Sequence, residues 1–65
     1  MTFREYLQTR KTENTPVGDL ASDALRDSGW KADTADSLRT RLRLMSAHPS
    51  ALGVLREAIA DYERV

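Results

Sequence analysis

The stretch Leu38–Met45, which reads LRTRLRLM, carries Arg39, Arg41 and Arg43 and no acidic residue. Arginine presents a planar fork of N–H donors that suits carboxylates and phosphates. Two kinds of binding chemistry are therefore open to this stretch. One is recognition of a protein partner with acidic side chains, and the other is contact with the backbone of a nucleic acid.

A helical projection of this stretch separates the arginines. Arg39 and Arg43 lie one turn apart on one flank, and Arg41 lies on the opposite flank. We expect Arg39 and Arg43, with Lys31, to form a small basic ridge; the alternative is a solvated helix flank. Leu44 points away from the core, either as a lone exposed leucine or as an anchor for a partner. The residues expected to face the core are Leu38, Leu42 and Met45.

Aspartates form a counterpart to this ridge. Asp19, Asp23 and Asp27 are spaced i, i+4, i+8, so on a helix they stack along one side. Arg26, three residues after Asp23, is placed to neutralise part of this acidic ridge. Ten basic and ten acidic residues give the chain a net charge of zero, so its charge is segregated rather than in excess. Head-to-tail self-association would use both ridges; alternatively, the ridges pair within one molecule or remain solvated.

Catalytic and metal chemistry have little support in this sequence. The chain has no cysteine and one histidine, His48, which precedes Pro49 and is expected to cap a helix or lie in a solvated turn. Asp33 and Asp36 lie where a helix begins, and carboxylates are favoured there by the helix dipole. A nucleophile or general base also needs a partner and a pocket that shifts its pKa. We therefore expect no enzyme, no cofactor and no metal site.

Length and hydropathy indicate one small domain spanning residues 1–65. At this size a chain buries only about 60% of its unfolded surface, so a stability of a few kcal/mol is expected. No apolar run approaches the roughly 20 residues that a membrane span requires, and the start MTFREYLQTRK lacks the apolar region of a signal peptide. These features predict a complete cytoplasmic protein that does not enter a membrane.

Local signals predict four helices and no strand. Thr2 and Glu5 have capping-box spacing, and Thr15–Pro16 combines an N-cap with a proline at the first helical position. Ser28–Gly29 is expected to end the second helix, with the glycine left-handed. Asp33 or Thr34 caps the third helix, and the fourth begins at Pro49. Trp30, in the connector, is expected to cover the core. The predicted core comprises Phe3, Tyr6, Leu7, Val17, Leu20, Ala21, Ala24, Trp30, Leu38, Leu42, Leu52, Leu55, Ile59 and Tyr62.

Three stretches resemble the small bacterial YozE-type family, whose fold is similar to a sterile-alpha-motif (SAM) domain. They are TFREYL, PVGDLASDALRDSGW and ALGVLREAIADYERV, in that order along nearly the whole chain. The chain departs from the family pattern at Ile59–Ala60, where an aromatic residue is expected beside the late tyrosine. The resemblance implies an all-α, compact four-helix SAM-like domain without a cofactor. SAM-like domains in general mediate protein association and a minority bind RNA, but a fold alone does not define a function.

These observations favour a small non-enzymatic protein-protein interaction domain of a bacterial or phage protein. Its partner is expected to be another protein or a second copy of the chain. The expected partner-binding residues are Arg39, Arg43 and Leu44 on one side, and Asp19, Asp23 and Asp27 on the other.

The alternative is a regulatory domain that binds RNA or DNA through Arg39 and Arg43. A helix-turn-helix is disfavoured, because the Gly29–Asp33 link is long and carries the bulky Trp30. An inhibitor of a host or phage enzyme is a lesser alternative, for which the sequence has no residue signature.

Overall fold

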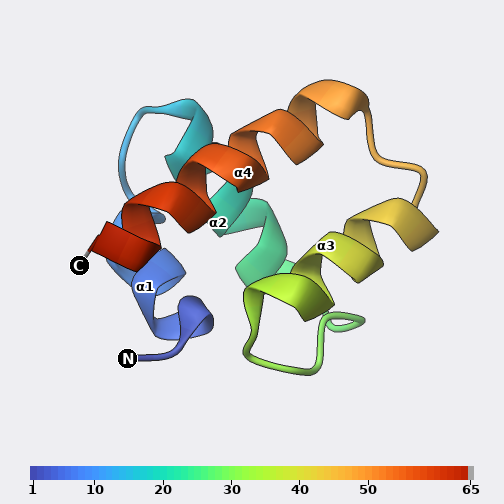
Figure 1. Cartoon of the computed structure of the whole chain (residues 1–65), viewed down its shortest axis with the longest axis horizontal. Coiled ribbons are helices and arrows are strands. Elements are labelled where there is room, and N and C mark those ends of the chain that lie inside the picture. Colours follow the sequence, from blue (N-terminus) through green and yellow to red (C-terminus); the bar gives the residue numbers. More distant parts are fainter. Residues whose placement is uncertain (65) are drawn as a thin grey trace.

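Four α-helices make up the computed structural model, which describes residues 1–64. Val65, the last residue of the expected domain, lies outside the described residues. The helices are α1 (Phe3–Arg10), α2 (Pro16–Arg26), α3 (Ala35–Leu44) and α4 (Pro49–Arg64), and residues 1–64 contain no strand. The predicted all-α, four-helix class is therefore confirmed. Figure 1 shows α4, the longest helix, lying over α2 and beside α1 and α3, with both termini at one end of the molecule.

The helix starts follow the local signals in the sequence. Thr2 and Glu5 form the predicted capping box, and the Thr15 side chain accepts a hydrogen bond from the Gly18 N–H. Of the two candidates at α3, Thr34 is the cap. Before α4, the Nδ1 atom of His48 accepts a hydrogen bond from the Ser50 N–H at 3.1 Å, so the only histidine serves as a helix cap. Each cap satisfies backbone N–H groups that the helix itself leaves free.

The helix ends differ from the prediction. Gly29 is not left-handed, and α2 already ends at Arg26. Asp27 takes an extended conformation, and its side chain accepts a hydrogen bond from the Gly29 N–H at 2.9 Å. A local aspartate turn thus replaces the expected glycine cap.

The left-handed residue is instead Ser46, after α3, with a φ angle of 54°. Its N–H donates to the Arg43 carbonyl, and the Ala47 N–H donates to the Leu42 carbonyl, at 3.0 and 2.9 Å. This pair of bonds is the Schellman arrangement, in which glycine is the usual residue. Because α3 ends at Leu44, Met45 is a cap residue and is 47% exposed. The prediction that Met45 faces the core is wrong for this reason.

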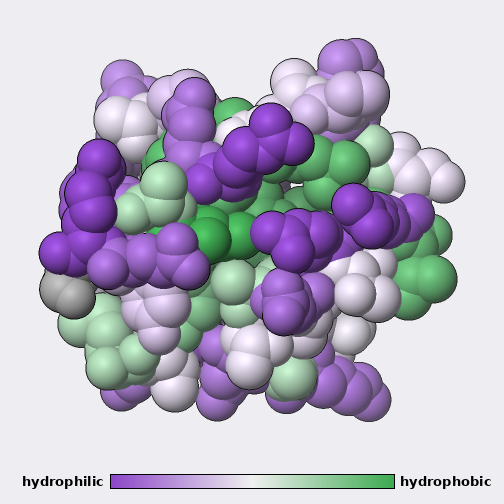
Figure 2. Space-filling view, in the orientation of Figure 1, coloured by the Kyte–Doolittle hydropathy of each residue, from purple (hydrophilic) through white to green (hydrophobic). Residues whose placement is uncertain are grey.

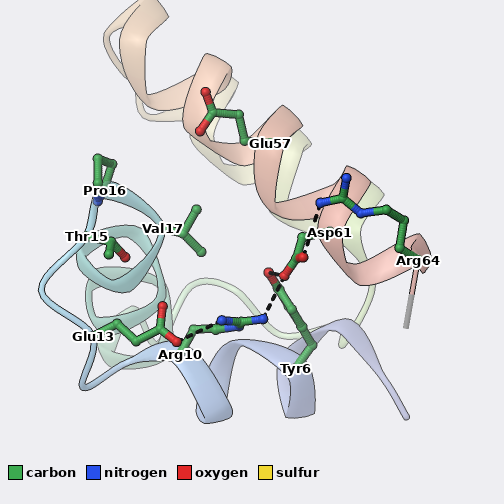
Figure 3. Close-up of a pocket in the computed structure, with 9 residues that line it drawn as sticks. All are labelled: Tyr6, Arg10, Glu13, Thr15, Pro16, Val17, Glu57, Asp61 and Arg64. Carbon is green, nitrogen blue, oxygen red and sulfur yellow. Dashed lines mark hydrogen bonds and ion pairs between the residues drawn. The ribbon is translucent and has the colours of Figure 1, made fainter.

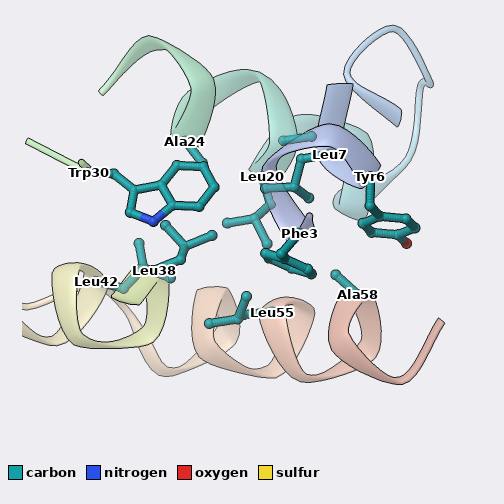
Figure 4. Packing of buried hydrophobic residues seen from close by; sticks show 11 residues of the cluster. Phe3, Tyr6, Leu7, Leu20, Ala24, Trp30, Leu38, Leu42, Leu55 and Ala58 are labelled. Carbon is teal, nitrogen blue, oxygen red and sulfur yellow. The ribbon is translucent and has the colours of Figure 1, made fainter. Parts of the chain in front are cut away.

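The core lies where α4 covers α1, α2 and α3. In Figure 4 the Trp30 indole lies between Ala24 and two leucines of α3, whereas Phe3 points toward α4. Trp30 is 3% exposed, which confirms that it covers the core. Most of the predicted core is buried, and Ala58 joins it. The predicted core residues that are only half-buried, and pack against the core, are Val17, Leu52, Ile59 and Tyr62.

Candidate functional site

Three arginines from two helices border one hollow between α3 and α4. The hollow has a volume of about 380 Å³ and is lined by Arg39, Arg43, Leu52 and Arg56. We call these four residues the arginine groove. Each helix contributes two residues one turn apart, which project to the same side. Figure 2 shows hydrophobic surface exposed between hydrophilic residues in the region between α4 and α3.

The positive charge of the arginine groove is only partly neutralised. Arg39 donates to Asp36 at 2.9 Å, an exposed pair three residues apart in sequence. Arg43 and Arg56 form no ion pair with any of residues 1–64. Clustered like charges around a partly apolar floor raise the local potential and attract anionic groups. Lys31, expected beside Arg39 and Arg43, does not line the groove.

Arg41 lies on the opposite flank of α3, as the projection predicted, and pairs with Asp27. Its guanidinium donates to both carboxylate oxygens of Asp27, at 2.8 and 3.1 Å. These hydrogen bonds, with a further one from the Gly29 N–H, hold the pKa of Asp27 below its usual value. Asp27 therefore joins the end of α2 to α3 and lies beyond the helix on which the acidic ridge was expected to stack.

The other two aspartates of the ridge are exposed on α2. Asp23 accepts a hydrogen bond from Arg26 at 2.6 Å, which confirms the expected neighbour, while Asp19 has no ion pair within the described chain. Two adjacent hollows, of about 240 and 180 Å³, run past all three aspartates and share Leu20, Asp23 and Ala51. We call their lining the acidic groove. Its remaining residues are Pro16, Asp19, Ala24, Asp27, Leu38, Leu42, Met45, Ser50 and Val54.

Leu44 is exposed, as expected, but lines neither groove. Its side chain is 75% exposed at the end of α3, and Met45 beside it is 47% exposed. The two residues form a small apolar tip. The sequence predicted Leu44 as the partner-binding neighbour of Arg39 and Arg43. In the structure their neighbours in the groove are Leu52 and Arg56 instead. The one sequence signal for Arg56 was its position four residues after Leu52, which places both residues on one face of the fourth helix.

A polar network joins α1 to α4 at the opposite end of the molecule (Figure 3). The Tyr6 hydroxyl donates to Asp61 at 2.6 Å, and Arg10 donates to Asp61 and Glu13 at 2.9 and 2.8 Å. Burial, followed by the hydrogen bond to Asp61, raises the pKa of Tyr6 to about 12. The hydrogen bond from Tyr6 in turn lowers the pKa of Asp61. Arg64 also donates to Asp61, at 3.3 Å. Because its charges pair with one another, we assign this network to folding rather than to binding.

The lowered pKa of Asp61 predicts a loss of stability in acid. A carboxylate with a folded pKa below its unfolded value, 3.8 for aspartate, stabilises the fold above that value. The contribution is lost as the pH falls through the lower folded value, and Asp27 and Glu5 act in the same direction. We expect Asp61→Asn to lower the urea midpoint at neutral pH and to reduce its decline between about pH 5 and pH 2.

Glu57→Gln is the matched control for this prediction. Glu57, with Tyr6 and Asp61, lines a hollow of about 360 Å³ beside this network, but its side chain makes no hydrogen bond within residues 1–64. Its urea midpoint and acid sensitivity should follow those of the wild type. If the urea midpoint falls with pH equally in Asp61→Asn and in the wild type, the network does not contribute to acid sensitivity.

Residues 1–64 contain neither a cluster of metal-ligating side chains nor a helix that could cross a bilayer. Within residues 1–64, no three histidine, cysteine, aspartate or glutamate side chains are placed to hold a metal ion. None of the four helices is both long and apolar enough to cross a bilayer. What remains is a pair of grooves of opposite charge on a small helical framework, which defines a small all-α domain with charged surface grooves.

The family of this domain follows from comparison with known proteins. The model of the YozE SAM-like fold family matches residues 2–64. The chain therefore belongs to the YozE SAM-like family, as the three sequence stretches indicated. Searches among curated proteins and among solved structures gave no match.

Proposed function

We propose that this chain is a non-catalytic binding domain that docks an acidic protein segment in the arginine groove. The observation that carries the proposal is the convergence of Arg39, Arg43 and Arg56 around Leu52, with the last two arginines unpaired within residues 1–64. Arginine binds carboxylates through two parallel N–H donors, so each free guanidinium offers a directional contact. Leu52 adds an apolar floor on which a hydrophobic side chain of the partner packs.

A nucleic acid is the second candidate, because the same three guanidiniums suit phosphates. Single-stranded RNA is usually held by exposed aromatic side chains that stack on bases. Phe3, Tyr6 and Trp30 are buried, and Tyr62 is half-buried, so no fully exposed aromatic ring lies beside the groove. A neutral net charge also differs from the basic balance of most nucleic-acid-binding domains. The groove therefore favours an acidic protein segment.

The test is binding of a fluorescein-labelled peptide of alternating glutamate and leucine, followed by anisotropy at low salt. We expect binding that weakens as salt is added, because the contacts are charged and exposed. The double variant Arg43→Glu with Arg56→Glu should reduce the affinity at least tenfold, since it reverses both unpaired charges of the groove. Helical circular dichroism should stay unchanged.

The control variant is Lys11→Glu with Lys31→Glu. It makes the same change in net charge at two exposed positions outside the arginine groove. Its affinity should stay close to that of the wild type. Equal losses in both double variants would mean that net charge, not the groove, governs binding, and would contradict the proposal. Random DNA or RNA bound more tightly than the peptide, with a log–log salt slope of about −3 for three phosphate contacts, would favour the second candidate.

A further inference from the structure

The arginine groove and the acidic groove lie on opposite sides of α4. Leu52 and Arg56 line the former, and Ser50 and Val54 line the latter. At 100° per residue, the two pairs are separated by about 160° around the helix axis. The same helix therefore forms one wall of both grooves, with α3 completing the first and α2 completing much of the second.

The two grooves complement each other in charge and in apolar content. Arg39, Arg43 and Arg56 surround Leu52 on one side. On the other, Asp19 and Asp23 border apolar walls formed by Leu20, Ala51 and Val54. Each groove thus combines an apolar floor with a charged border, of opposite sign in the two cases. Opposite potentials on two surfaces of one neutral molecule attract a second copy.

We propose that the partner of the arginine groove is a second copy of this chain, which presents the Asp19–Asp23 edge of its acidic groove. This inference rests on the proposed function, because it names the acidic segment that the arginine groove receives. Asp19 has no ion pair within residues 1–64. Asp23 pairs only with Arg26, in a contact where both side chains are 73% exposed, so an exchange of partners costs little.

The placement of the grooves also determines the form of the assembly. Two different surfaces of each copy meet, so the contact is heterologous rather than two-fold. Since the grooves face opposite ways from α4, a dimer that uses one contact leaves one groove of each kind unoccupied. Further copies add to these free grooves, and the assembly grows head to tail. Asp27 is not required, because Arg41 already holds both of its carboxylate oxygens.

A mixing experiment tests this assembly. The arginine variant carries Arg43→Glu and Arg56→Glu, and the acidic variant carries Asp19→Lys and Asp23→Lys. In sedimentation velocity at low salt, the wild type should grow in size with protein concentration and return to monomer as salt is added. Each variant alone should be monomeric, because one of its two grooves is reversed. An equimolar mixture should form dimers or larger species, because the intact groove of each variant meets the intact groove of the other and the two reversed grooves are also opposite in charge.

Contrary outcomes separate this inference from the proposed function. A wild type that is monomeric at every concentration and salt would overturn self-association. If the monomer nevertheless binds the glutamate–leucine peptide through Arg43 and Arg56, the proposed function stands with a foreign partner. If the wild type neither self-associates nor binds the peptide, both the inference and the proposed function are overturned. A mixture that stays monomeric while the wild type assembles would overturn the assigned residues. If charge reversal unfolds a variant, Arg43→Gln and Asp19→Asn provide the same test, with each expected to shift wild-type assembly to higher protein concentration.

Discussion

Replacing Gly18 with alanine is expected to remove about 3 kcal/mol of stability, which is most of what a domain of this size has. Gly18 is buried in the first turn of α2, against the loop that follows α1. A Cβ atom there would overlap the Glu13 carbonyl oxygen and approach the Arg10 carbonyl oxygen to 3.0 Å. Both neighbours are backbone atoms, so relief requires α2 to move away from α1. Urea unfolding followed by far-UV circular dichroism measures the loss.

Gly53→Ala is the matched control, because it makes the same chemical change in another helix. A Cβ atom at Gly53, within α4, would meet no atom within 4 Å. Alanine restricts the unfolded chain more than glycine does, so this variant should gain about 0.5–1 kcal/mol. The two substitutions should therefore shift the urea midpoint in opposite directions. A Gly18→Ala variant as stable as the wild type would show that the α1–α2 contact adapts easily.

The contrast between Gly18 and Gly53 shows which features of the fold local sequence patterns do not predict. Helix starts were predicted correctly, because a threonine cap and a proline at the first position act within a few residues. The close approach of α2 to the loop before it depends on tertiary packing and has no such local signal. The prediction of a left-handed Gly29 was wrong for a related reason. The Asp27 carboxylate accepts a hydrogen bond from the Gly29 N–H, which forms the turn, and it also accepts one from Arg41 of α3.

The candidate site, like the fold, was predictable only where the signal lies within one helix. A helical period alone placed Arg39 and Arg43 on one flank and Arg41 on the other. Arg56 belongs to a helix whose position beside α3 is determined by the core, so the third arginine of the groove appears only in the folded chain. On the acidic side, helical spacing grouped Asp27 with Asp19 and Asp23. The helix ends one residue earlier than that spacing requires, and Asp27 pairs with Arg41 instead.

Trp30 joins α3, which carries two residues of the arginine groove, to α1. Its indole N–H donates to the Ser37 hydroxyl of α3 at 2.8 Å. The Arg4 guanidinium of α1 lies 4.1 Å from the centre of its ring, and the same side chain donates to the Trp30 carbonyl at 2.8 Å. Trp30 thus helps Leu38 and Leu42 to hold α3 against the rest of the core. Since α3 carries Arg39 and Arg43, the groove depends on Trp30 through the stability of the fold, although Trp30 does not line it.

Trp30→Ala is therefore expected to destabilise the protein by about 3–5 kcal/mol, the usual cost of truncating a buried aromatic side chain. A domain of this size has roughly that much stability, so far-UV circular dichroism should show a largely unfolded chain at room temperature. Titration with trimethylamine N-oxide, which favours the folded state, allows the loss to be measured by extrapolation. Peptide binding should return in the same titration, because Arg39, Arg43 and Arg56 are all retained.

Ser37→Ala separates the burial of the indole from its hydrogen bond. This variant removes the acceptor of the indole N–H and leaves the ring in place, so it should cost about 1–3 kcal/mol. A loss for Ser37→Ala as large as that for Trp30→Ala would mean that the hydrogen bond, rather than the buried ring, holds α3. A Trp30→Ala variant that stays folded without the osmolyte would mean that α3 is held by Leu38 and Leu42 alone. In that case the arginine groove would survive independently of the Trp30 connector.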